Sequence, residues 1–127
     1  MAQLVHPTLS YRIVGILFDV YNSLGGGYQE KYYQRAVATA FKQAGIQCQE
    51  QVVMPLMFGD RSIGRYFLDF VVDGRIVLEI KAQPTFYKRD IKQVLAYLKS
   101  SGISLAILAS FTRNGLKFHR VLKGHSR

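Results

Sequence analysis

Residues 65–82, RYFLDFVVDGRIVLEIKA, constrain the fold more than any other part of the chain. The stretch holds two apolar runs rich in β-branched and aromatic residues, and an Asp-Gly pair at 73 and 74 separates them. Such runs are typical of strands, and Asp-Gly is typical of a tight turn between them. We therefore predict two antiparallel strands, over 65–72 and 75–82.

The rest of the chain divides into helical and strand patterns. Apolar residues at intervals of three and four predict helices over 9–24, 28–44 and 86–100. Further strands are predicted over 47–58, 104–111 and 116–122, with GDRSIG, residues 59–64, as a turn. The order α, α, β, β, β, α, β, β over 127 residues predicts one domain, 1–127, of the α/β class.

Three charges interrupt the two apolar strands. Side chains alternate along a strand, so Glu79 and Lys81 share a face. Asp69 joins that face if the connecting loop has three residues, such as 72–74, whereas a two-residue turn would place it opposite Leu78. Two carboxylates and a main-chain carbonyl would bind Mg²⁺ or Mn²⁺. The alternative is a purely structural ion pair between Lys81 and one of the two acids.

The net charge points to a polyanionic partner. Seventeen Lys and Arg against eight Asp and Glu give a formal charge of +9, which attracts nucleic acid. The single cysteine, Cys48, has no partner for an intrachain disulfide. The N-terminal sequence has no leader pattern, and no apolar run is long enough to span a membrane, so we expect a cytoplasmic protein.

Four short motifs, GYQEKYY from Gly27, LDF around Asp69, LEIKA around Glu79 and QVLAY from Gln93, resemble the PD-(D/E)XK nuclease superfamily. The spacing of Gly27, Glu30 and Tyr33 further resembles its GxxExxY family. The resemblance covers about Ser10 to Val121. It implies a restriction-endonuclease-like αβββαβ core, with a central mixed sheet flanked by helices.

The resemblance also implies roles for individual residues. Asp69 and Glu79, joined by Glu30 from the preceding helix, would hold Mg²⁺ or Mn²⁺, and Lys81 would serve the attacking water. Gln93 and Tyr97 match the QxxxY element that borders the site in the RecB-like branch.

The sequence departs from the family in three places. Leu68 stands where the superfamily's name has proline. Tyr21 stands where histidine is expected, and ASFT at 109–112 replaces Asn-Phe-Gly. The metal-binding acids are retained, so the departures bear on substrate contacts.

Basic and aromatic residues alternate near the start of the third helix, in TFYKRDIK. Aromatic rings stack on bases and cations bind phosphates, so we expect nucleic-acid contacts there and near the hairpin turns. A solvated helix start is the alternative. The predicted contact residues are Tyr87, Lys88, Arg89, Lys92 and Arg65. His6, His119 and His125 are not spaced as metal ligands and are expected at the surface.

The sequence thus predicts a metal-dependent nuclease, with DNA as the expected substrate and a homodimer as a plausible assembly. One alternative is a nucleic-acid-binding module that retains the nuclease fold without cleaving. Another is an interaction subunit that uses the apolar first helix.

Overall fold

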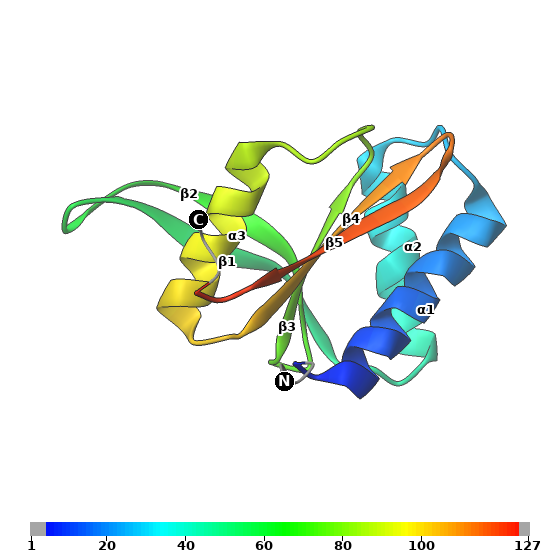
Figure 1. The fold of residues 1–127 in the computed structure, drawn as a ribbon, viewed down its shortest axis with the longest axis horizontal. Coiled ribbons are helices and arrows are strands. Elements are labelled where there is room, and N and C mark those ends of the chain that lie inside the picture. The colour runs from blue at the N-terminus through cyan, green and yellow to red at the C-terminus, as the bar shows by residue number, and fades with distance from the viewer. Residues whose placement is uncertain (1–4, 125–127) are drawn as a thin grey trace.

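The computed structural model describes residues 5–124 and consists of three helices and a five-stranded sheet (Figure 1). His125 lies outside the described residues. The elements are α1 Pro7–Leu24, α2 Glu30–Gln43, β1 Cys48–Phe58, β2 Arg61–Val72, β3 Ile76–Lys81, α3 Lys88–Ser101, β4 Leu105–Thr112 and β5 Gly115–Leu122.

The five strands lie in chain order, β1-β2-β3-β4-β5. Strands β3 and β4 are parallel, and the other neighbouring pairs are antiparallel. Helix α3 connects the parallel pair, as a parallel connection requires a crossover. The predicted α/β class and mixed sheet are confirmed.

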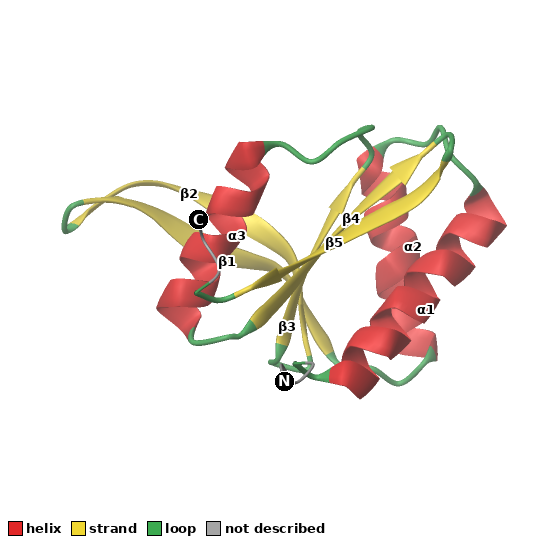
Figure 2. Cartoon of the chain, in the orientation of Figure 1, coloured by secondary structure: helices red, strands yellow, loops and turns green. Residues whose placement is uncertain are grey.

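Helices cover both faces of the sheet (Figure 2). One apolar cluster packs α1 and α2 against one face and includes Ile13, Val37 and Leu78. A second cluster packs α3 against the other face and includes Val94 and Val77. Because Val77 and Leu78 are neighbours on β3, each face of the central strand buries its own set of side chains.

The structure of the loop between α1 and α2 shows what Gly27, Glu30 and Tyr33 each do in this chain. Gly27 has φ +103°, which a residue with a side chain rarely adopts. Glu30 is the first residue of α2. The ring of Tyr33 is fully buried, and its hydroxyl donates to the Gly25 carbonyl at 2.6 Å. Tyr33 therefore ties the loop to the core and fixes where α2, and with it Glu30, begins.

The predicted boundary of the second strand was wrong. Residues 59–64 were expected as one long turn, but β2 begins at Arg61 and only Gly59 and Asp60 form the turn. Gly59 has φ +62°, which permits a two-residue connection. A bulge at Ile63 then resets the pairing with β1. The result is a β1–β2 hairpin that projects from the body of the molecule (Figure 1).

The loop between β2 and β3 settles which residues share a face. Val72 pairs with Ile76, so the loop consists of residues 73–75, one position later than 72–74 but with the predicted length of three. Asp73 and Gly74 both have positive φ, +52° and +65°. Continuing this register places Asp69 opposite Glu79. The arrangement that brings the two carboxylates together is the one observed.

Candidate active site

Asp69 lies where β2 separates from both of its neighbours. Pairing of β2 with β3 ends at Phe70 and Leu78, and pairing with β1 omits Asp69. Gln51, the residue that would face Asp69 on β1, has φ +52°. Side chains replace the missing ladder bonds. The Asp69 N–H donates to Glu79 Oε1 at 2.8 Å, and the Ile80 N–H donates to Asp69 Oδ2 at 2.7 Å.

Both carboxyl groups are buried, and their protonation reflects this. Loss of water raises the pKa of Asp69, although the bond from Ile80 and the charge of Lys81 oppose the rise. Burial also raises the pKa of Glu79, and the neighbouring Asp69 charge raises it further. Burying two adjacent anions costs free energy, so a nearby cation would stabilise the ionised form of this pair.

Glu30 reaches the pair through an intermediate side chain. Gln34 lies one turn after Glu30 on α2, and its amide nitrogen donates to Asp69 Oδ1 at 2.9 Å and to Glu30 Oε2 at 3.4 Å. Sequence reasoning placed Glu30 at the site but missed Gln34. The four-residue spacing was the available signal, because residues four apart share a helix face.

Lys81 lies between two carboxylates. Its ammonium nitrogen is 4.0 Å from Glu79 Oε2 and 3.9 Å from Asp90 Oδ1. Asp90 is buried, and its Oδ2 accepts from the Tyr87 N–H at 3.2 Å and from Gln83 Nε2 at 3.1 Å. Asp90 thus links the start of α3 to the site. Sequence reasoning missed it, since in TFYKRDIK it reads as one exposed charge among several.

Tyr66 brings a further polar group to this region. Its hydroxyl is buried and has no hydrogen-bond partner within the described residues. Burial raises its pKa, and the charges of Glu79 and Asp90 add to the rise. The hydroxyl therefore lies within the electrostatic reach of both carboxylates, on the side of the sheet that packs against α3. Its place within an apolar strand gave no signal in the sequence.

The two predicted residues of α3 are less closely engaged. Tyr97 packs against the apolar layer between α3 and the sheet, and Gln93 is half-buried one turn earlier. The structure gives neither side chain a hydrogen bond to Asp69 or Glu79 among the described residues. The role of Gln93 and Tyr97 in the site stays a prediction.

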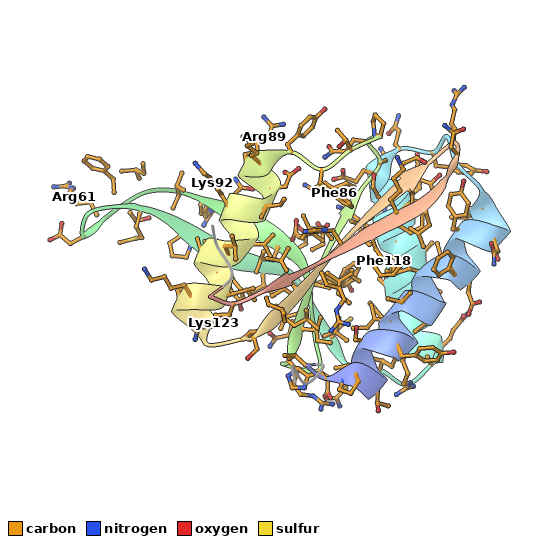
Figure 3. All side chains as sticks on the ribbon, viewed as in Figure 1. Arg61, Phe86, Arg89, Lys92, Phe118 and Lys123 are labelled. Carbon is orange, nitrogen blue, oxygen red and sulfur yellow. The ribbon has the colours of Figure 1, made fainter. Side chains whose placement is uncertain are left out.

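The predicted nucleic-acid contact residues are all at the surface, as expected. They occupy two separate regions of it. Tyr87, Lys88, Arg89 and Lys92 are exposed at the start of α3, and the Arg89 guanidinium lies 5.2 Å from the centre of the Tyr87 ring. Figure 3 shows Arg89 and Lys92 on the first turns of α3. Arg65 is exposed on the β1–β2 hairpin, 5.7 Å from the centre of the Phe67 ring.

Two of the departures from the family pattern meet in the structure. The Tyr21 hydroxyl donates to the main-chain carbonyl of Thr112 at 2.7 Å, and the Tyr21 ring lies 6.2 Å from that of Phe111. The first departure is near the end of α1 and the second is at the end of β4. The residues of the two departures therefore contact each other and join α1 to β4.

Of the two histidines within residues 5–124, only one is fully at the surface, where both were expected. His119 is exposed, as predicted, and its ring lies 6.2 Å from that of Phe86. His6 is half-buried because it precedes the first turn of α1, so its surface assignment was only partly right.

The donor set suits a hard divalent cation, although it is incomplete. In residues 5–124, no three His, Cys, Asp or Glu side chains are close enough to hold a metal. Glu30 is thus not gathered with the strand acids as the expected third ligand. Asp69 and Glu79 each keep one carboxylate oxygen that no main-chain N–H occupies. Paired buried carboxylates are the donors that Mg²⁺ and Mn²⁺ prefer.

Comparison with known proteins identifies the family. The model of the PD-(D/E)XK nuclease superfamily matches residues 7–121, so the chain belongs to this superfamily. A search of curated protein sequences finds no significant match. No helix within the described residues is long and apolar enough to cross a membrane.

Two solved structures share the fold. The crystal structure of SSO0001 has a TM-score of 0.55 at 14% sequence identity, and covers 76% of this chain and 50% of its own. The alkaline exonuclease LHK-Exo from Laribacter hongkongensis has a TM-score of 0.50 at 14% identity, with 73% and 54% covered. The chain thus spans about half the length of these proteins, and its fold is restriction-endonuclease-like.

Proposed function

We propose that the chain is a divalent-metal-dependent nuclease that hydrolyses phosphodiester bonds in DNA. The observation that carries the proposal is the convergence of Asp69, Glu79 and Lys81 where β2 and β3 separate. Family membership supports the reaction class. The formal charge of +9 supports a polyanionic substrate.

The three residues have distinct roles in the proposed reaction. Asp69 and Glu79 would hold Mg²⁺ or Mn²⁺, and a bound ion supplies Lewis-acid stabilisation of the phosphate oxygens. Lys81 would orient the attacking water and stabilise developing negative charge. Asp90 keeps the Lys81 ammonium near Glu79, and Gln34 holds Glu30 beside the pair.

Burial strengthens the electrostatic interactions within this arrangement. An ammonium and two carboxylates that are largely shielded from water interact more strongly than they would at the surface. The hydrogen bonds between β2 and β3 fix both acids before substrate arrives, so little reorganisation accompanies the reaction. Membership of the GxxExxY family, a cytoplasmic location and a homodimer belong to the same hypothesis.

The test is cleavage of labelled DNA and RNA, single- and double-stranded, in Mg²⁺, Mn²⁺ or EDTA. The variants are Glu79→Gln and Lys81→Met. We expect metal-dependent cleavage of DNA by the native chain and a loss of at least about 100-fold in both variants. Glu50→Gln is the matched control, because Glu50 is an exposed acid on β1.

Binding separates the enzyme from a module that only binds. In EDTA, Lys81→Met should bind DNA within about threefold of the native chain, because most of the positive charge remains. If the native chain cleaves no substrate in either metal and still binds DNA with strong salt dependence, the nuclease proposal is refuted. A binding module on a nuclease fold would then remain.

A further inference from the structure

The β1–β2 hairpin carries an unusual number of exposed apolar side chains. It extends away from the helices, and Arg61 lies at its tip (Figure 3). Six large apolar side chains on it are exposed: Val53, Leu56, Met57, Phe58, Ile63 and Phe67. Contiguous exposed apolar surface marks a place where something binds. The composition of the arm indicates what that is.

The two faces of the hairpin differ. On one face Val52, Tyr66 and Leu68 pack into the cluster beneath α3. On the other, Val53 and Phe67 pair across the strands and are 50% and 44% exposed. Pairing brings Arg65 next to them on the same face. The uncovered face is therefore both apolar and cationic.

Aromatic rings and arginines occur in pairs along this arm. The Arg65 guanidinium lies 5.7 Å from the centre of the Phe67 ring. At the tip, Phe58 is 75% exposed and pairs directly with Arg61 across the turn. A ring that stacks on a base beside a cation that binds its phosphate is the usual composition of a single-strand platform.

The arm leads directly to the site. Arg65 and Phe67 precede Asp69 by four and two residues on the same strand. The regular alternation of side chains is interrupted at Asp69, because Leu68 packs beneath α3 whereas Phe70 packs against α1 and α2. At ~3.3 Å per residue, Arg61 lies about 26 Å along the strand from Asp69.

We propose that the β1–β2 hairpin, with Arg65 and Phe67 on its uncovered face and Phe58 and Arg61 at its tip, binds a single-stranded segment of nucleic acid that leads away from the carboxylates. The inference rests on the proposed nuclease function and specifies its substrate as nucleic acid with unpaired bases. Charge complementarity favours this occupant over a second copy of the chain. Two copies would bring arginines against arginines in proteins of charge +9.

A second aromatic–arginine pair provides the control. Tyr32 is 43% exposed, and the Arg35 guanidinium lies 5.7 Å from its ring centre. Geometry and exposure therefore match the Arg65–Phe67 pair. Tyr32 is two residues from both Glu30 and Gln34 on α2, so it points away from the side of the helix that faces the site.

The experiment measures fluorescence anisotropy of a labelled DNA single strand of about 20 nucleotides, longer than the arm, in EDTA so that no cleavage occurs. Arg65→Ala/Phe67→Ala should weaken binding by about tenfold or more. Arg35→Ala/Tyr32→Ala should change it by less than about twofold, although it removes the same charge. A fully paired duplex should discriminate less between the two variants, since its bases are not free to stack.

The double variant Phe58→Ser/Arg61→Ala provides a second test of binding by the arm. Both residues are exposed at the tip, so the variant is expected to fold normally. It should weaken binding of the long strand and leave that of a strand of about four nucleotides unchanged. If both arm variants bind the long strand like the native chain, the arm inference is refuted and the nuclease proposal stands. If the native chain binds no nucleic acid, both fail. Lower self-association without weaker DNA binding would identify a dimer contact and also refute the inference.

Discussion

The main-chain N–H of Asp69 donates to Glu79 Oε1 at 2.8 Å, so one site acid holds the strand that carries the other. The Asp69 carboxylate accepts in turn from the residue after Glu79, Ile80. These bonds stand where the β2–β3 ladder has ended. The separation of the strands exposes the two carboxylates to each other, and the side-chain bonds keep the gap from becoming disordered.

The first prediction concerns stability and pH. In the metal-free protein burial raises the pKa of Asp69 to about 6 and that of Glu79 to about 8, above their unfolded-state values. The folded state therefore retains protons that the unfolded state releases. The free energy of unfolding should fall as the pH rises from about 4 to about 8. Thermal melts in EDTA across this range measure the effect.

Glu79→Gln isolates the contribution of this pair. The amide oxygen can still accept from the Asp69 N–H, but the buried charge is gone. We expect the variant to be more stable than the native chain at pH 8 by on the order of 1–2 kcal/mol, and to differ little from it at pH 5. An equal difference at both pH values would show that the pair does not titrate in this window.

The second prediction assigns a positioning role to Asp90. Asp90→Asn keeps an oxygen for the Tyr87 N–H but removes the charge that faces Lys81. We expect kcat to fall by about tenfold, with KM within about twofold of the native value, because the substrate still binds. Steady-state cleavage kinetics provide the measurement. An increase in KM at constant kcat would place Asp90 in substrate binding instead.

The third prediction concerns the unpaired hydroxyl of Tyr66. A buried polar group without a partner lowers stability, so removing it should not cost stability. We expect Tyr66→Phe to melt at or above the native temperature in EDTA. A decrease in melting temperature corresponding to more than about 1 kcal/mol would mean that the hydroxyl is hydrogen-bonded in solution.

The fourth prediction tests the loop before α2. A Cβ added at Gly26 would lie 2.5 Å from the Thr112 carbonyl oxygen and 2.6 Å from the Arg113 Cα, which are main-chain atoms. Gly26→Ala should therefore destabilise the protein by about 1–3 kcal/mol. Gly15→Ala is the matched control, because Gly15 lies within α1 with nothing within 4 Å, and it should stabilise by about 0.5–1 kcal/mol. Chemical denaturation of both variants measures the two effects.

Periodicity predicted the elements because local patterns decide them. The helices and strands occur in the expected order, with boundaries displaced by a few residues. The exception is the start of β2, where Arg61 to Gly64 contain no apolar alternation. Their strand conformation depends on cross-strand pairing with β1 in the hairpin, which the propensity of a single strand does not contain.

The part of the site that depends on which strand residues share a face was predictable from the sequence. A three-residue loop sufficed to place Asp69 opposite Glu79, and the Asp-Gly sequence favoured a left-handed turn. The side chains that surround the two acids were harder to predict from the sequence. Gln34, Asp90 and Tyr66 come from three different elements, and only the packing of α2 and α3 on the sheet brings them to the strand acids.

Metal binding by Asp69 and Glu79 is the central claim, and Mn²⁺ binding followed by electron paramagnetic resonance tests it most directly. The account predicts that the native chain and Glu50→Gln bind Mn²⁺, that Asp69→Asn and Glu79→Gln do not, and that Mg²⁺ displaces the bound ion. Equal Mn²⁺ binding by all four proteins, or none by the native chain, would contradict the account.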